Sequence, residues 1–108
     1  MGEQVIADFV TRLRNSFPDV RVILFGSRAR GDHLESSDYD LIIISKTFED
    51  IPFIYRPAHI YPFWDLDQDV EPLCYTPKEF ERKQKHLGIV RVAVQEGLEV
   101  KLPASTHG

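Results

Sequence analysis

Two short runs of apolar, largely β-branched residues constrain the fold of this chain more than any other feature. Residues 20–25 read Val-Arg-Val-Ile-Leu-Phe, and residues 38–45 read Asp-Tyr-Asp-Leu-Ile-Ile-Ile-Ser. Both have the length and composition of β-strands. Residues 70–75 form a third such run, in which Pro72 has no N–H to donate and therefore predicts an edge strand or a bulge. We predict a sheet built on these three strands, with residues 98–102 as a last short strand.

An amphipathic helix is expected before the first strand. Over residues 3–16, apolar side chains recur at helical spacing and charged residues occupy the rest of the surface. The apolar positions are Val5, Ile6, Phe9, Val10 and Leu13. Residues 46–64 are rich in aromatic residues and proline and show no sustained period. We expect them to form a long connection packed against the edge of the domain.

A second helical segment has a clear start and end. Thr76 suits the N-cap, Pro77 the first helical position and Glu79 the reciprocal position of a capping box. We predict a helix from this point that is broken near Gly88 and stopped by Gly97. Together these elements predict an α+β fold, a mixed and twisted β-sheet with helices packed on one face.

Length and composition narrow the classes of protein. The 108 residues suit one domain over positions 1–108, with 103–108 as a flexible tail, and 43% hydrophobic residues allow a packed core. The net charge of −4 argues against long nucleic acid as a partner. No apolar run approaches the roughly 20 residues of a membrane span, and the N-terminus lacks the features of a signal peptide. We therefore expect a cytoplasmic protein with no membrane partner, and a buried thiol at the lone Cys74.

The first strand leads into a segment suited to binding phosphate. Gly26 lets backbone amides approach a ligand closely, and Ser27 adds a hydroxyl donor to an anion-binding turn. Arg28 and Arg30 offer planar cations that match phosphate oxygens, and Gly31 frees the backbone again. A Gly-Ser turn alone usually has no function beyond turning the chain, so the prediction of a phosphate site depends on the residues that accompany the turn.

A pair of carboxylates opens the second strand. Asp38 and Asp40 are two residues apart on a strand, so both point to the same face with their Cβ atoms about 6–7 Å apart. Like charges at the mouth of an apolar strand repel each other and lose hydration. A bound cation would remove this penalty, and Mg²⁺ typically uses one or two carboxylates together with substrate phosphates.

The stretch Gly-Ser, Arg-Ala-Arg-Gly-Asp, Ser-Asp-Tyr-Asp-Leu resembles the signature of the polymerase-β-like nucleotidyltransferase superfamily. More narrowly, it is similar to the minimal nucleotidyltransferases (MNT) that are paired, as antitoxins, with HEPN-domain proteins. The resemblance implies that Gly26 and Ser27 hold the triphosphate of ATP or another nucleoside triphosphate, with help from Arg30. It further implies that Asp38 and Asp40 are catalytic and bind two Mg²⁺ ions.

The family also has a third carboxylate on a following strand. Asp67, Asp69 and Glu71 share one parity on an extended chain, so all three could face one side. The segment that begins Val70-Glu71 resembles the family's third strand and places Glu71 at the catalytic, metal-binding position. Glutamate is one methylene longer than the family's aspartate, and Asp69 is the alternative.

The resemblance implies transfer of a nucleoside monophosphate, AMP from ATP, to an acceptor hydroxyl with release of pyrophosphate. A domain this small predicts an acceptor site completed by a partner protein or by a second subunit. The resemblance points to a HEPN-type partner, a tyrosine of which can be the acceptor. Two alternatives stay open: a catalytically inactive, antitoxin-like module that neutralises its partner by contact, and transfer to a small molecule such as an antibiotic. Five aromatic residues of the connection are expected to pack against the domain; these are Phe53, Tyr55, Tyr61, Phe63 and Trp64.

Overall fold

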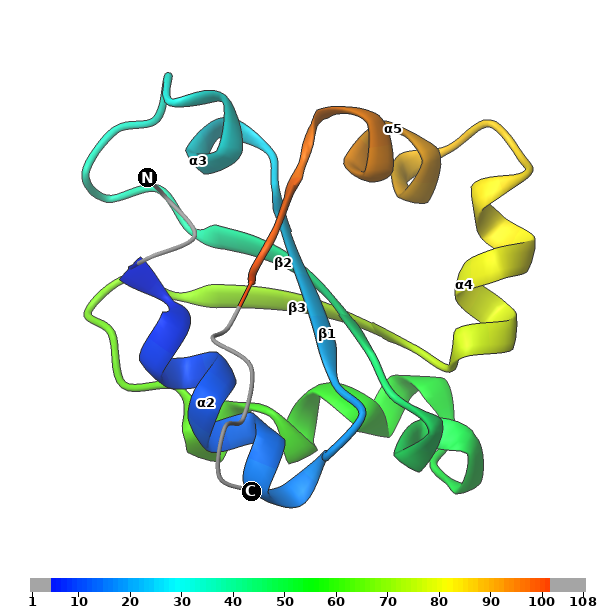
Figure 1. Ribbon diagram of the computed structural model, residues 1–108. Helices are drawn as coiled ribbons and strands as arrows, with labels where there is room; N and C mark the ends of the chain where they lie inside the picture. Colours follow the sequence, from blue (N-terminus) through cyan, green and yellow to red (C-terminus); the bar gives the residue numbers. More distant parts are fainter. Residues whose placement is uncertain (1–4, 102–108) are drawn as a thin grey trace.

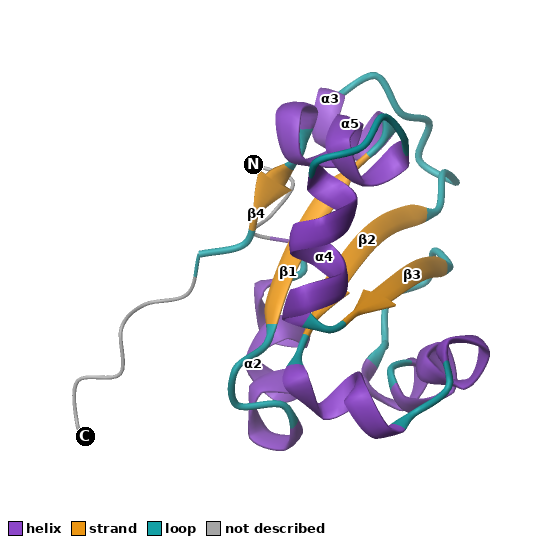
Figure 2. Ribbon diagram, turned by 90° about the vertical axis from the view of Figure 1, so that its right-hand side faces the viewer, coloured by secondary structure: helices purple, strands orange, loops and turns teal. Residues whose placement is uncertain are grey.

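A four-stranded mixed sheet forms the centre of the molecule. The computed structural model describes residues 5–101, and within them the strand order is β3-β2-β1-β4 (Figure 2). The strands are β1 (Arg21–Phe25), β2 (Tyr39–Ile44), β3 (Val70–Tyr75) and β4 (Leu98–Glu99). β1 runs antiparallel to β2 and β4, whereas β2 and β3 are parallel. The predicted α+β fold with a mixed sheet is therefore confirmed.

Helices cover both faces of this sheet (Figure 1). One face carries α2 (Ala7–Ser16) and three 3₁₀ helices, and the other carries α4 (Pro77–Gln84) and α5 (Ile89–Glu96). The 3₁₀ helices are η1 (Lys46–Asp50), η2 (Phe53–His59) and η3 (Tyr61–Phe63). The prediction of helices on one face only is therefore wrong.

The physical reason for helices on both faces lies in the two central strands. Val22, Leu24, Leu41 and Ile43 point into the core with α2, and Ile23, Phe25, Ile42 and Ile44 point into the core with α4 and α5. A strand that is buried on both faces reads as a continuous apolar run, whereas a strand with one solvated face alternates. The unbroken Leu-Ile-Ile-Ile run of β2 therefore already carried the signal for two covered faces.

The capping box at the start of α4 is present as predicted. The Thr76 side chain accepts a hydrogen bond from the Glu79 backbone N–H (3.2 Å), and the Glu79 carboxylate accepts one from the Thr76 N–H (2.9 Å). The break near Gly88 is also confirmed, because α4 ends at Gln84 and α5 begins at Ile89. Within the described residues, none of the helices is long and apolar enough to cross a bilayer. The predicted tail 103–108 lies outside these residues.

The connection between β2 and β3 is anchored by a buried arginine that the sequence pattern did not reveal. Arg56 is 5% exposed, and it donates to both oxygens of the Glu79 carboxylate (2.6 and 3.2 Å) and to the Cys74 carbonyl (3.1 Å). Hydrogen bonding to Arg56 lowers the pKa of Glu79. Cys74 is buried as predicted, and burial raises the pKa of its thiol to about 12. This ion pair ties η2 to the edge strand and to the first turn of α4.

Candidate active site

The phosphate-binding turn predicted after β1 is a glycine followed by one turn of helix. Gly26 adopts φ 77° and ψ −158°, a backbone conformation that residues other than glycine rarely adopt. A Cβ at this position would lie 2.5 Å from Oδ2 of Asp40. α3 (Ser27–Arg30) follows and ends at Gly31 in the left-handed conformation. The glycine therefore lets the turn lie directly against one of the predicted metal-binding carboxylates.

Arg28 does not serve the role expected of it. Its guanidinium donates to the carbonyls of Ser37 (2.9 Å) and Glu35 (2.8 Å) and to the Tyr39 hydroxyl (3.1 Å). It also stacks on the Tyr39 ring, with 4.0 Å between the guanidinium carbon and the ring centroid. These contacts occupy Arg28 in closing the loop between α3 and β2, so it is a structural residue rather than a phosphate ligand.

Arg30 remains the cation of this turn with the freedom to meet an anion. Its side chain is 50% exposed, and its contacts to Asp32 (3.3 Å) and Glu96 (4.0 Å) are long. Burial and Asp38 raise the pKa of Asp40, and the positive charge of Arg30 partly offsets that rise, so Arg30 acts on the carboxylate cluster. Exposed ion pairs of this kind contribute little stability, so Arg30 can exchange them for a ligand at small cost.

The three predicted carboxylates come together on one face of the sheet. Asp40 on β2 lies opposite Glu71 on β3, and Asp38 precedes Asp40 by two positions. Burial and the negative charge of Asp38 raise the pKa of Asp40. A side-chain hydrogen bond with Asp38 and the charge of Asp40 raise the pKa of Glu71. The three groups therefore interact, and the charge of Arg30 offsets their repulsion only in part.

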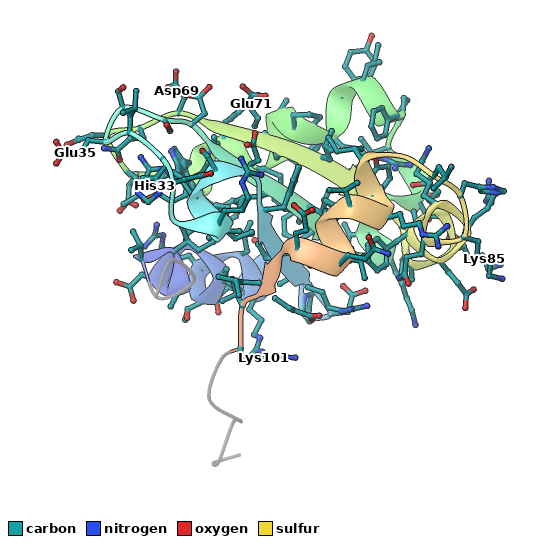
Figure 3. The ribbon with its side chains drawn as sticks, turned by 90° about the horizontal axis from the view of Figure 1, so that it is seen from above. His33, Glu35, Asp69, Glu71, Lys85 and Lys101 are labelled. Atoms are coloured by element: carbon teal, nitrogen blue, oxygen red, sulfur yellow. The ribbon has the colours of Figure 1, made fainter. Side chains whose placement is uncertain are left out.

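Asp69 lies near this cluster, but in a different position. It precedes β3, and its carbonyl accepts the hydrogen bond of the Tyr39 N–H (2.9 Å). Its side chain and that of Glu71 project from the same edge of the molecule (Figure 3). Asp69 lines a cavity together with Asp38 and Glu71, whereas Asp67 lines neither this cavity nor the one beside Asp40. The register places Glu71 opposite Asp40, and Asp69 directly precedes Val70, the partner of Tyr39, so both carboxylates lie near Asp38 and Asp40.

The donor set suits a hard divalent cation in its chemistry. Carboxylate oxygens are the ligands that Mg²⁺ prefers, and mutual repulsion among three of them is relieved by a cation. In residues 5–101 no group of three or more His, Cys, Asp or Glu side chains is gathered so that it could hold a metal ion as it stands. Because Mg²⁺ usually completes its shell with water and substrate phosphates, the residues fit an ion that arrives with a nucleotide.

Two neighbouring cavities flank the carboxylates. One has a volume of about 330 Å³ and is lined by Asp40, Glu71 and the apolar side chains of Phe25, Leu73 and Ile89. The other has about 420 Å³ and is lined by Asp38, Asp69, Glu71 and Trp64. Tyr61, like Glu71, lines both cavities. The two cavities form an open site around the carboxylates of β2 and the edge strand β3.

The aromatic residues of the connection divide into two groups. Trp64 packs edge-on against Phe9 (4.9 Å) and Tyr39 (5.3 Å), and Phe63 packs edge-on against Phe17 (6.3 Å), so the predicted packing role is confirmed for Phe63 and Trp64. The other three are about half exposed; they are Phe53 (48%), Tyr55 (59%) and Tyr61 (51%). Their exposure had no signal in the sequence, because residues in 3₁₀ turns show no helical period.

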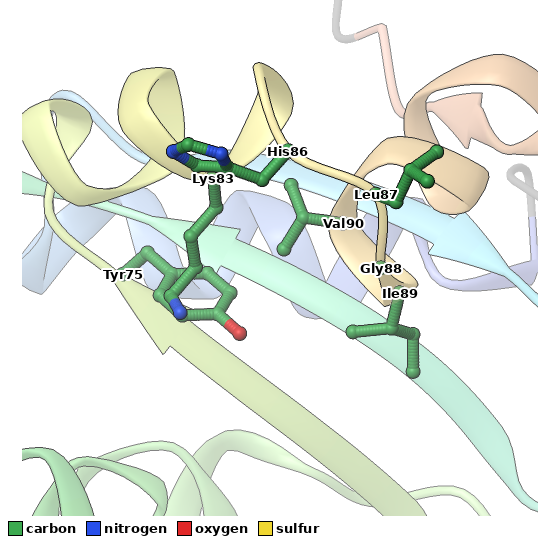
Figure 4. A pocket seen from close by; sticks show the side chains of 7 residues that line it. All are labelled: Tyr75, Lys83, His86, Leu87, Gly88, Ile89 and Val90. Atoms are coloured by element: carbon green, nitrogen blue, oxygen red, sulfur yellow. The ribbon is translucent and has the colours of Figure 1, made fainter.

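A smaller cavity of about 160 Å³ lies between α4 and α5 (Figure 4). Its lining includes Tyr75, Lys83, His86 and Ile89, with Lys83 Nζ 5.6 Å from the centre of the Tyr75 ring. None of the predicted site residues lines it. It is therefore separate from the carboxylate cluster, although Ile89 also lines the larger cavity beside Asp40.

Comparison with known proteins supports the same region. A family model described as a nucleotidyltransferase domain matches residues 6–102, a range that contains the Gly26 turn and all three carboxylates. A crystal structure of a "putative nucleotidyltransferase" from Sulfolobus solfataricus superposes with a TM-score of 0.63 at 24% identity. The match covers 90% of this chain and 77% of that chain, and it shows a shared fold.

Two curated proteins of Methanocaldococcus jannaschii are also similar, and each is named a "putative protein adenylyltransferase". One is 40% identical over 55 residues, which are 49% of this chain and 51% of that protein. The other is 27% identical over 89 residues, which are 77% of this chain and 60% of that protein. The chain thus spans between half and three fifths of the length of these relatives.

Proposed function

The chain belongs to the nucleotidyltransferase domain family, and from this premise we propose that it transfers AMP from ATP to a hydroxyl group of a protein, with release of pyrophosphate. The observation that carries the proposal is the convergence of Asp38, Asp40 and Glu71 beside the Gly26 turn. The names of the two archaeal relatives support a protein as the acceptor and an adenylyl group as the cargo.

The turn after β1 would hold the triphosphate. Gly26 brings the backbone close to the ligand, and Ser27 offers a hydroxyl donor at the start of α3. Arg30 would bind an outer phosphate oxygen once it leaves Asp32 and Glu96. These groups position the nucleotide and favour negative charge on the leaving pyrophosphate, which is most of what phosphoryl transfer asks of a protein.

Two Mg²⁺ ions would be held by the carboxylate oxygens of Asp38, Asp40 and Glu71, which are ligands that Mg²⁺ prefers. Bound magnesium supplies charge neutralisation and Lewis acidity at the attacking and leaving oxygens. Glu71 lies on the edge strand β3, which β2 separates from the strand that leads into the Gly26 turn, so it would orient the acceptor hydroxyl and take up its proton. The open cavities beside Glu71 give the acceptor its path of approach.

The resemblance of the motif to minimal nucleotidyltransferases supports a HEPN-type protein as partner and a tyrosine of that partner as acceptor. An acceptor site that is open on one side is consistent with completion by another chain. A second copy of this chain is the alternative for that role.

A second candidate function is a non-catalytic module that neutralises its partner by contact. Two observations favour it: glutamate at the third carboxylate position, and the lack of a ready-made metal site among residues 5–101. In this case the carboxylates would persist without binding nucleotide productively.

A transfer assay separates the two functions. The purified chain is incubated with Mg²⁺, α-labelled ATP and a lysate of the source organism, and labelled proteins are resolved by gel. We expect protein labelling by the wild type, none by Asp38→Asn, and full labelling by Asp67→Asn, a matched control whose exposed side chain lies outside the cavities. Labelling that survives in Asp38→Asn contradicts the assignment, and complex formation without label supports the contact module.

A further inference from the structure

Tyr61 is the one tyrosine among residues 5–101 that lines both cavities flanking the carboxylates. It shares each of these cavities with Glu71, and one of them also with Asp40. Its side chain is 51% exposed, although it lies close in the chain to residues that pack into the core. The residue before η3, Ile60, is fully buried, and Trp64 after η3 packs into the core.

Hydrogen bonds hold the backbone around Tyr61 in place, so its exposed ring has a fixed point of attachment beside the cavities. The Trp64 N–H donates to the Tyr61 carbonyl (3.0 Å), and the Phe63 carbonyl accepts from the Arg12 guanidinium (2.9 Å). The Trp64 indole donates to the Gln68 carbonyl (2.7 Å). These contacts fix the backbone and leave the two side-chain torsions of Tyr61 free to move its hydroxyl within the cavities.

Strand order places Tyr61 on the side from which an acceptor must enter. The triphosphate turn follows β1, whereas Glu71 lies on β3 at the opposite edge, with β2 and its two aspartates between them. In phosphoryl transfer the attacking and leaving oxygens lie on opposite sides of the phosphorus. With pyrophosphate leaving towards Gly26, the attacking hydroxyl approaches from the edge where Tyr61 lies.

We propose that Tyr61 is itself a nucleotidyl acceptor, so that the chain adenylylates its own Tyr61 hydroxyl within the same molecule. This inference rests on the proposed function, because it uses the same carboxylates and the same donor. In the step, the Tyr61 hydroxyl oxygen forms a bond to the α-phosphorus of ATP, and the bond from that phosphorus to the bridging oxygen of the β-phosphate breaks. Pyrophosphate leaves, and the phenolic proton passes to the Glu71 carboxylate, which lines both cavities with Tyr61.

The consequence is a modification that occupies the acceptor side of the site. An adenylyl group on Tyr61 would fill part of the two cavities that Tyr61 lines, which together are comparable in size to a small-ligand pocket. Self-modification would therefore compete with transfer to another protein. The chain would be active towards partners before modification and slower after it.

The test uses the purified full chain with ATP and Mg²⁺, followed by intact-mass measurement and peptide mapping. We expect the wild type to gain one adenylyl group, mapped to the peptide that contains Tyr61, and Tyr61→Phe to gain none. Tyr55→Phe is the matched control, because Tyr55 is equally exposed on the adjoining η2 but lines neither cavity, and it should be modified like the wild type. The modified fraction at a fixed time should not depend on protein concentration.

The outcomes separate this inference from the proposed function. Labelling of lysate proteins by a wild type that gains no mass overturns self-modification and leaves the transferase intact. An unchanged mass gain in Tyr61→Phe, or a modified fraction that rises with protein concentration, overturns modification of Tyr61 within one molecule. Absence of both labelling and mass gain overturns the proposed function, and the inference with it.

Discussion

Replacement of Gly26 by alanine tests how the turn and the carboxylates are coupled. Gly26 has φ 77° and ψ −158°, and a non-glycine residue held in such a conformation costs about 1–3 kcal/mol. The added Cβ would also lie 2.5 Å from Oδ2 of Asp40 and 3.3 Å from its Cγ, so the carboxylate must move. A catalytic group displaced by about 1 Å typically loses about 100-fold in rate.

Gly31→Ala provides the matched control for the contact. Gly31 has φ 85° and ψ 7°, and nothing lies within 4 Å of its added Cβ, so only the left-handed conformation is penalised, by about 1–2 kcal/mol. We expect urea unfolding to show a loss of stability in both variants. We expect nucleotide transfer to fall about 100-fold in Gly26→Ala and to stay near the wild-type rate in Gly31→Ala. Equal rates in the two variants would refute the coupling of Gly26 to Asp40.

Three further predictions follow from the ion pairs and the carboxylates. Arg56→Met should lower the free energy of unfolding, measured in urea, by about 3 kcal/mol, because it leaves the partly buried Glu79 carboxylate without its ion-pair partner. The loss should be smaller in the double variant Arg56→Met, Glu79→Gln. Asp40→Asn should raise the free energy of unfolding at pH 7 by about 0.5 kcal/mol, a value reduced for solvent screening. The pKa of Asp40 is raised in the folded state, so the folded state binds the proton more tightly than the unfolded state. The stability that protonation of Asp40 gives is therefore present at low pH and is lost as the pH rises through the raised pKa. The gain in Asp40→Asn should therefore vanish below about pH 3.9, and a gain that persists there would contradict it. Arg28→Lys should lower the melting temperature, because it breaks the hydrogen bonds that close the loop between α3 and β2. Arg30→Gln should leave the melting temperature unchanged and slow nucleotide transfer. A lower melting temperature in Arg30→Gln and slower transfer in Arg28→Lys would contradict these roles.

Much of the fold could be predicted because local chemistry and tertiary structure agree in several segments. The run at 70–75 is a strand with the predicted bounds, and Pro72 indeed lies on an edge strand. The carbonyls of Asp69 and Tyr75 accept hydrogen bonds from β2 and the residue after it, so the odd-numbered residues of β3 direct their backbone groups towards β2. The backbone of Pro72 therefore faces outward, where its missing N–H costs nothing. The Thr76 capping box is equally local, since its partners are three residues apart.

The features that could not be predicted depend on contacts between distant parts of the chain. Arg56 meets Glu79 across 23 positions, and a lone arginine among aromatic residues gives no periodic signal. The motif predicts Arg28 as a phosphate ligand, yet its partners are backbone carbonyls seven and nine residues away, which no residue type reveals. The sequence predicts packing for Tyr61, whereas in the structure it lies half exposed in η3 and lines the cavity beside Asp40.

The candidate site shows the same division. Asp38 and Asp40 could be paired from strand alternation alone, because their spacing decides their face. Their approach to Glu71 needs the parallel register of β2 and β3, which pairs Asp40 with Glu71. The sequence leaves Glu71 and Asp69 as alternatives, and the register adds that Glu71 lies opposite Asp40.

The most direct test of the central claim is calorimetric titration of the protein with a non-hydrolysable ATP analogue in the presence and absence of Mg²⁺. If Asp38, Asp40 and Glu71 receive magnesium with the nucleotide, the wild type and Asp67→Asn should bind the analogue tightly only when Mg²⁺ is present. Asp40→Asn should lose that dependence on Mg²⁺. Binding by Asp40→Asn that matches the wild type in affinity and in Mg²⁺ dependence would contradict the account.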